Sequence, residues 1–161
     1  MGFQTSVRQF MTTGIVGDIC IQGAVRSQPG ILVTEDPTNN VIGRAVTHVA
    51  NSDGQFEAGG EGVFAGILTN SKNYALYGGL TPTITLPNNI PVEATTFASG
   101  IIVSLADAAT IGQAVFYSTT TGELKAGTSG TTISGYAEIP NSKVVRNNTS
   151  AAGLAIIELT N

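Results

Sequence analysis

The sequence is divided into many short runs of apolar and β-branched residues, each ended within a few positions by a turn signal. Val, Ile, Thr, Tyr and Phe recur in these runs, and such residues favour pleated strands. Pro, Gly, Asn and Asp gather between the runs and supply the fixed or positive φ angles that tight turns require. Such turns are expected at 28–30, 36–40, 52–54 and 87–89. Many short strands at this spacing predict an all-β fold, either a sandwich or a barrel.

The pattern within the runs predicts where strands lie and how they are buried. In 113–119, Ala114 and Phe116 alternate with Val115 and Tyr117, so we expect a half-buried strand. The run 154–157 is apolar on both faces, which is typical of a central strand or one covered by a partner. Only 104–112 has the residues for a helix, of one or two turns, so very little helix is expected. The expected strands are 15–25, 30–34, 41–50, 62–69, 74–78, 81–86, 90–97, 100–105, 113–119, 132–139 and 153–160.

Length and composition indicate one domain. A chain of 161 residues with 42% apolar residues can build one sizeable core. Only 11% of the residues are charged, against about 25% in a typical domain. A surface of Thr, Ala and Gly can be buried against a neighbour without the desolvation of ions. Residues 1–12 show little regular apolar pattern, so we expect an N-terminal arm or flexible terminus there, followed by a single β domain over 13–161.

Charge and cysteine content exclude several partners. The net charge of −4 lacks the basic footprint of a protein that binds phosphate backbones, so no nucleic acid is expected. No apolar run approaches the ~18 residues of a membrane span, and the N-terminus lacks the apolar part of a signal peptide. We therefore expect a soluble protein with no membrane partner. Cys20 is the only cysteine, which suits a reducing cytosol, and its place between Ile19 and Ile21 predicts a buried or semi-buried strand residue.

The stretch GGEGVFAG, residues 59–66, has the spacing of a dinucleotide-binding loop at Gly60, Gly62 and Ala65. Such a loop follows a buried strand and opens a helix, with its backbone N–H groups on a pyrophosphate. The polar residues before Gly59 do not predict a strand, and the apolar run after it ends at Asn70, too early for a crossover helix. We therefore expect a glycine-rich loop that leads into a strand, and no cofactor site.

His48, the single histidine, is the candidate for a catalytic base. A catalytic triad would need it as the base, with one of four aspartates, and no nucleophile elbow accompanies it. One His and one Cys cannot fill a four-coordinate zinc site within one chain. No catalytic, cofactor or metal residue is therefore predicted, and we expect a protein that is not an enzyme. The aspartates weighed as partners of His48 are Asp18, Asp36, Asp53 and Asp107.

Three stretches together resemble the structural cement or decoration proteins of tailed-bacteriophage heads. They are the start MGFQTSV with the later GIVGDI, the segment GVFAGILTNSKNYALYG, and the region from GIIVSLADAATIGQAVFYSTTTGEL to the C-terminus. Residues 63–78 and 111–124 carry the most specific parts. The resemblance implies an all-β subunit, with a jelly roll as one form, that oligomerises on the outer capsid surface. It also implies no enzymatic activity and no cofactor.

From this resemblance the expected partners are the major capsid protein and further copies of the chain, as a homodimer or a homotrimer. The expected location is the capsid exterior, after synthesis in the host bacterial cytoplasm. A β-sandwich carbohydrate-binding or host-recognition module of a virion stays open as the alternative, although the absence of Trp disfavours sugar stacking. Candidate capsid or subunit contacts lie in the N-terminal arm, at Gly2, Phe3, Gln4, Arg8 and Phe10.

Overall fold

The computed structural model describes residues 14–70, 85–147 and 149–160. Within these residues the chain is all β, as predicted, and its one helical element is the short 3-10 turn η1 (Pro37–Asn39). No helix in this part of the chain is long and apolar enough to cross a membrane. The strands are β1 (Val25–Leu32), β2 (Ala45–His48), β3 (Gln55–Ala58), β4 (Phe64–Leu68), β5 (Pro91–Leu105), β6 (Ala114–Ser118), β7 (Leu124–Gly127), β8 (Tyr136–Glu138), β9 (Ser142–Arg146) and β10 (Gly153–Thr160).

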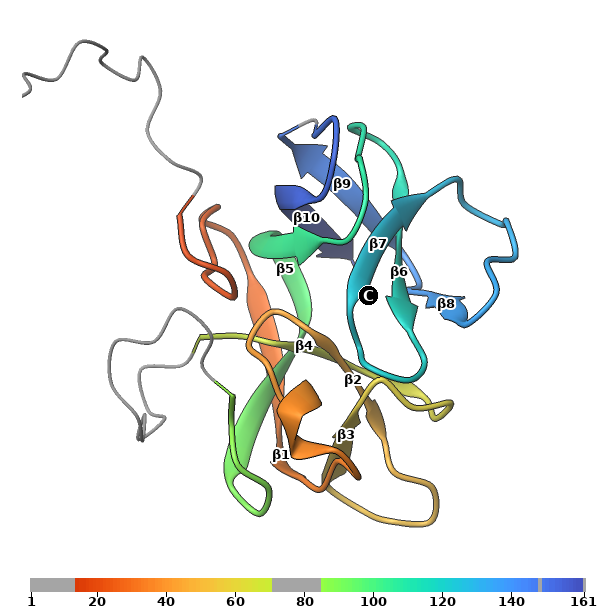
Figure 1. Cartoon of the computed structure of the whole chain (residues 1–161). Helices are drawn as coiled ribbons and strands as arrows, with labels where there is room; N and C mark the ends of the chain where they lie inside the picture. Colours follow the sequence, from red (N-terminus) through yellow and green to blue (C-terminus); the bar gives the residue numbers. More distant parts are fainter. Residues whose placement is uncertain (1–13, 71–84, 148, 161) are drawn as a thin grey trace, which may run out of the picture.

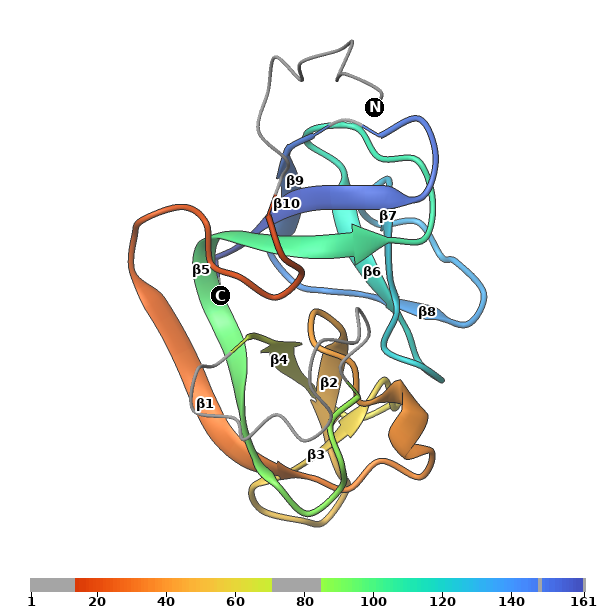
Figure 2. The ribbon, with the colours of Figure 1, turned by 60° about the vertical axis from the view of Figure 1, so that its left-hand side comes forward.

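Strand β5 connects the two halves of the molecule. It passes from the group that contains β1 to β4 into the group that contains β6 to β10 (Figures 1 and 2). The sequence pattern predicted two strands here, 90–97 and 100–105, because Ser99 and Gly100 interrupt the apolar run. That division is wrong. Gly100 lies inside the strand and makes room for Ile21, since a Cβ on Gly100 would lie 2.5 Å from Cγ1 of Ile21.

The first half of β5 closes a circuit of five strands. In order around the circuit, β1 pairs with β3, β3 with β2, β2 with β4, β4 with β5, and β5 again with β1. Only the pairing of β1 with β3 is parallel. The circuit encloses its own apolar cluster, which contains the fully buried side chains of Leu32, Phe56 and Leu68.

The second half of β5 belongs to another circuit with a separate cluster. Strand β5 pairs with β10, β10 with β9, β6 with β7, and β7 with β5 at Leu124 and Leu105.

Strand β9 is linked to β6 by Ser142, whose Oγ accepts from Val115 N at 3.1 Å. It is linked to the residues before β6 by two further hydrogen bonds, from Val144 N to Gln113 O and from Gly112 N to Val144 O, both 2.8 Å. The ten strands form one mixed sheet, which strand pairing closes at β1 and β5. The second circuit is completed only by the hydrogen bonds of Ser142 and Val144. The jelly-roll arrangement stays a prediction.

Strand boundaries differ from the prediction where pairing overrides local signals. The expected turn 28–30 lies inside β1, where Gln28, Pro29 and Gly30 pair with Ala94, Glu93 and Val92. Proline lacks a backbone donor but is tolerated on strands with one unpaired side, and from Val25 to Gly30 the described pairing of β1 is with β5 alone.

Three other strands and one expected helix were also assigned wrongly. Strands β3, β7 and β9 were not predicted, because their polar and charged residues alternate with few apolar ones. The segment 104–112 forms no helix and instead contains an isolated bridge at Ala109. Most of 15–25 is likewise outside any strand. The expected strand 74–78 lies outside the described residues, as does most of 81–86.

The burial of β10 agrees with the prediction from the sequence, and that of β6 does not. Strand β10 is central, between β5 and β9, with Ala155 and Ile157 fully buried. Strand β6 is buried on both faces and is not half-buried as predicted. The face that carries Phe116 is covered because its ring lies beside Gly127, the last residue of β7, and near Ile133 in the connection from β7 to β8.

Candidate interaction surface

The groups weighed for catalysis do not come together. His48 is half-buried, and its Nε2 lies 3.3 Å from Nε2 of Gln28. Its ring packs against Phe56 in a T-shaped arrangement, with 5.2 Å between the ring centroids. Among the aspartates, Asp18 accepts a hydrogen bond from Asn70, Asp36 caps η1, and Asp107 pairs with Lys125 at 2.6 Å. The described residues contain no group of three side chains that could hold a metal ion.

The glycine-rich stretch 59–66 lies at a joint between the two circuits, which we define as Ala45, Gly59, Gly60, Thr119 and Gly122. Gly59 N donates to Ala45 O at 3.0 Å, Gly60 N to Thr119 O at 2.7 Å, and Ala45 N to Gly122 O at 2.9 Å. The predicted loop leading into a strand is confirmed by β4. The expectation that no strand precedes the loop is wrong, because β3 ends at Ala58. The glycines thus permit backbone contact between loops.

Cys20 is exposed, contrary to the prediction of a buried or semi-buried strand residue. Its backbone N–H donates to Gly100 O at 3.0 Å, so the chain is held against β5 while the side chain lies at the surface. Partial desolvation raises the pKa of the Cys20 thiol. Cys20 belongs to a surface segment, residues 14–22, that we call the strap.

The strap is firmly attached to the rest of the fold. Gly17 N donates to Ile102 O at 2.7 Å, and Ile102 N donates to Asp18 O at 2.9 Å. On the other side, Asn70 N donates to Gly17 O at 2.9 Å, and Asn70 Nδ2 to Asp18 Oδ1 at 3.0 Å. These contacts hold Gly17 and Asp18 against the fold, whereas two aliphatic side chains of the strap lie at the surface: Ile15 is 65% exposed and Ile19 41% exposed.

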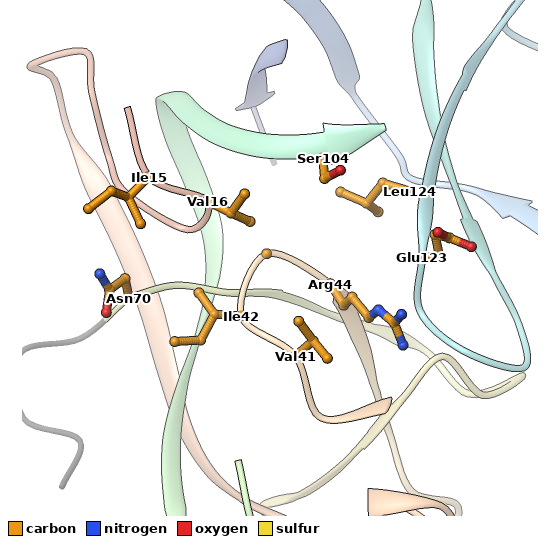
Figure 3. A pocket seen from close by; sticks show the side chains of 10 residues that line it. Ile15, Val16, Val41, Ile42, Arg44, Asn70, Ser104, Glu123 and Leu124 are labelled. Atoms are coloured by element: carbon orange, nitrogen blue, oxygen red, sulfur yellow. The ribbon is translucent and has the colours of Figure 1, made fainter. Parts of the chain in front are cut away.

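A cleft of about 360 Å³ lies on one side of the strap, between the two circuits (Figure 3). Ile15 and Val16 border it from the strap, Val41 and Ile42 from the turn before β2, and Leu124 from β7. The wall is therefore largely aliphatic. Two charged side chains also line the cleft. The guanidinium of Arg44 donates to Asn39 Oδ1 at 2.9 Å, and the side chain of Glu123 is exposed.

A second cleft of about 420 Å³ flanks the other side of the strap. Ile19 and Val25 border it together with the acidic side chains of Asp18 and Glu93. Val25 is 42% exposed, so the apolar surface continues from the strap into the start of β1. The strap and the two clefts form one candidate interaction surface, and this geometry suits protein contacts better than a small-molecule reaction.

Sequence reasoning missed this surface and selected a neighbouring segment. The candidates Gly2, Phe3, Gln4, Arg8 and Phe10 all lie outside the described residues. The apolar residues of 15–25 were assigned to a strand, because alternation alone does not reveal which face of a segment is covered. The absence of charge in this segment, apart from Asp18, was the signal that could have identified it.

Two comparisons with known proteins found a match, one to a family and one to a fold. A family model described as structural cement protein (E217 gp24/Pam3 gp6) matches residues 3–160. Among solved structures, a chain from "The capsid of Myoviridae Phage XM1" is similar in fold, with a TM-score of 0.67 and 14% sequence identity. That similarity covers 100% of this chain and 99% of the other. No curated protein matches the sequence.

Proposed function

This chain belongs to the phage structural cement protein family, and from that membership we propose that it binds the outer surface of the head, bridges major capsid protein subunits and stabilises the mature particle. The match over residues 3–160 is the observation that carries the proposal. It confirms the resemblance found in the sequence. The partners are the major capsid protein and further copies of this chain, without nucleic acid or membrane. The chain performs no reaction and reaches the capsid exterior from the host cytoplasm.

The physical case rests on avidity and on low charge. A subunit that bridges two capsomers makes its second contact at an effective concentration near millimolar, so modest individual affinities suffice. Only 11% of the residues carry charge, which lowers the desolvation cost of a broad contact. The exposed aliphatic side chains of the strap add apolar area to such a contact.

The carbohydrate-binding alternative gains no support from the surface. Sugar sites stack their ligands on exposed aromatic rings, and among residues 14–70 and 85–147 every Phe and Tyr is buried or half-buried. Two of the half-buried rings are also covered by cations, Phe97 by the guanidinium of Arg26 at 5.7 Å and Tyr136 by the ammonium of Lys125 at 5.6 Å. We therefore propose the cement function alone.

Co-sedimentation tests the proposal. Full-length protein is mixed with expanded heads that lack it, and in parallel with free major capsid protein. We expect saturable occupancy on the heads, weak binding to the free protein, and decorated heads that resist heat better than bare ones. The proposal is wrong if full-length protein does not sediment with the heads.

Removal of residues 1–12 tests the N-terminal candidates. We expect the β fold to persist, because the described circuits begin after this segment, and capsid occupancy to fall at least tenfold, about 1.4 kcal/mol. A full-length variant with Phe3→Ser and Phe10→Ser shows how much of the capsid binding comes from these two aromatic side chains and how much from the rest of the segment. Equal occupancy of all three proteins would remove the arm from the mechanism.

A further inference from the structure

The side chain of Gln28 joins three strands of the first circuit. From Val25 to Gly30 the backbone of β1 pairs with β5 alone. Gln28 is half-buried on this stretch, and its Nε2 donates to Ala65 O of β4 and lies 3.3 Å from Nε2 of His48 on β2. One side-chain amide therefore connects β1 to two strands with which its backbone does not pair.

Ala65 requires this donor because it is left out of the strand pairing. Strand β2 pairs with Gly66 and with Phe64 but not with Ala65, which is the extra residue of a β-bulge. Ala65 is fully buried, and a buried carbonyl without a donor is costly. The need for a donor fixes the orientation of the Gln28 amide, with its nitrogen toward Ala65 O.

This orientation determines which form of His48 fits beside it. The amide nitrogen of Gln28 has two hydrogens and no acceptor, so its contact with Nε2 of His48 is a hydrogen bond only when that ring nitrogen accepts. A neutral ring with its proton on Nδ1 accepts there. A protonated ring carries N–H on both nitrogens and would oppose one donor with another. Rotation of the amide would turn its oxygen against Ala65 O.

The charged residues around His48 lie on another face or at the surface. Glu57 follows Phe56 on β3 and pairs with Thr47, so alternation places it on the opposite face of the sheet, beside Gly60. The partners described for the ring, the amide and Phe56, are uncharged. The remaining charged residues of the neighbouring strands and loops are Arg44, which lines the first cleft, and the exposed Arg26, Asp53, Glu61 and Glu93.

We propose that Gln28 and His48 form an acid-sensitive latch across the first circuit, closed while His48 is neutral and open when its ring is protonated. Histidine changes its charge between about pH 5 and 8, so mild acid opens the latch. The latch stabilises the circuit at neutral pH, and this contribution is lost as the pH falls. The inference concerns the fold and holds whether or not the chain decorates a capsid.

NMR spectra of the wild-type protein test the latch directly. His48 is the only histidine, so every histidine ring signal belongs to it. At neutral pH, long-range proton–nitrogen spectra should show the proton on Nδ1 and none on Nε2. As the ring becomes protonated in mild acid, the side-chain amide signals of Gln28 should shift with it. The proposal is overturned if Nε2 carries the proton at neutral pH, or if the Gln28 amide signals stay still while the ring titrates.

Urea unfolding at neutral pH and in mild acid measures the effect on the fold. His48→Phe keeps an aromatic ring beside Phe56 and does not titrate. On acidification the unfolding constant of the wild type should rise roughly two- to tenfold more than that of His48→Phe, the range for the loss of one hydrogen bond.

A second variant should change the sign of this effect. Gln28→Glu replaces the donor with a carboxylate that accepts from a protonated His48 ring, so acid should stabilise this variant relative to His48→Phe. Equal pH dependence of the wild type and His48→Phe would refute the latch. So would a Gln28→Glu variant that loses as much stability in acid as the wild type does.

Discussion

Two glycines at the joint allow backbone atoms to approach where any side chain would intervene. Gly59 and Gly122 have φ angles of +75° and +71°, which L-residues rarely adopt. A Cβ on Gly59 would lie 2.9 Å from Gly122 N, and one on Gly122 would collide with Ala45 O. The loops after β3 and β6 can therefore exchange backbone hydrogen bonds with the start of β2.

A matched pair of glycine substitutions distinguishes two losses in the free energy of unfolding. One comes from the positive φ angle, and the other from the clash of an added Cβ with backbone atoms. Gly54 has the same φ of +71° as Gly122, but its Cβ would meet nothing within 4 Å. We expect Gly54→Ala to lower the free energy of unfolding by about 1 to 2 kcal/mol and Gly122→Ala to lower it further, by about 3 kcal/mol or more, because backbone must also move. Urea unfolding measures both. Equal losses would show that the joint tolerates a methyl group.

Glu138 makes one loop sensitive to acid. Its carboxylate accepts from Ser129 Oγ at 2.6 Å and from Gly130 N at 2.8 Å, and these bonds lower the pKa of Glu138. A carboxyl whose folded pKa is depressed stabilises the fold above its unfolded pKa, and this contribution is lost as the pH falls through the folded pKa. The Gly130 amide shift in NMR spectra should therefore titrate below the usual range of a glutamate.

Glu138→Gln is the control for this titration. The amide keeps an acceptor for one donor and has no charge to lose, so the Gly130 shift should stay flat over the same pH range. A titration that persists in Glu138→Gln would assign the effect to another group.

Strand β10 shows how one element can support a whole circuit. It pairs with β5 over Gly153–Thr160 and with β9 on its other side, and it places Ile157 and Leu159 in the apolar cluster. Its loss would expose both neighbouring strands and leave their backbone groups unpaired. Such an element contributes through its pairing as well as through its side chains.

Deletion of 154–161 should abolish soluble folding. The shorter chain loses the strand between β5 and β9, so we expect aggregation or a disordered circular-dichroism spectrum. Ile157→Ala is the milder companion, and its expected loss is about 2 to 5 kcal/mol. A deletion variant that remains soluble with an unchanged spectrum would place β10 outside the core.

At the scale of the whole molecule, the two apolar clusters share β5 and meet again at the joint. Ala45 and Ile67 come from strands of the first circuit yet pack in the cluster of the second. Separate hydrophobic clusters often mark separate domains. Here the shared strand and the packing of these two residues predict one cooperative unit, as in the single β domain expected over 13–161.

Native-state hydrogen exchange tests this cooperativity. Phe56→Ala in the first cluster should destabilise the protein by about 3 kcal/mol or more. If both circuits unfold together, the most protected amides of β5, β9 and β10 should exchange roughly a hundredfold faster as well. Ile157→Ala provides the reciprocal measurement. Acceleration confined to the circuit that carries the substitution would divide the chain into two independent units.

The sequence by itself determined the features that depend on local chemistry. The all-β class followed from short β-prone runs, and the turn at 36–40 followed from Asp36, whose side chain accepts from Thr38 N at 3.0 Å. The central position of β10 followed from an apolar run on both faces. The three resembling stretches indicated the cement protein family, and the family match over residues 3–160 confirms it.

Tertiary structure alone decided the features that depend on distant partners. Pro29 and Gly30 lie in a strand because β5 supplies their pairing, and Gly100 stays within β5 because Ile21 covers it. The exposed face of the strap depends on which side of residues 14–22 meets β5, a choice that hydrophobic alternation does not encode. Strand pairing joins residues far apart in the chain, so the local sequence specifies the capacity to pair, and packing selects the partner and the face that remains at the surface.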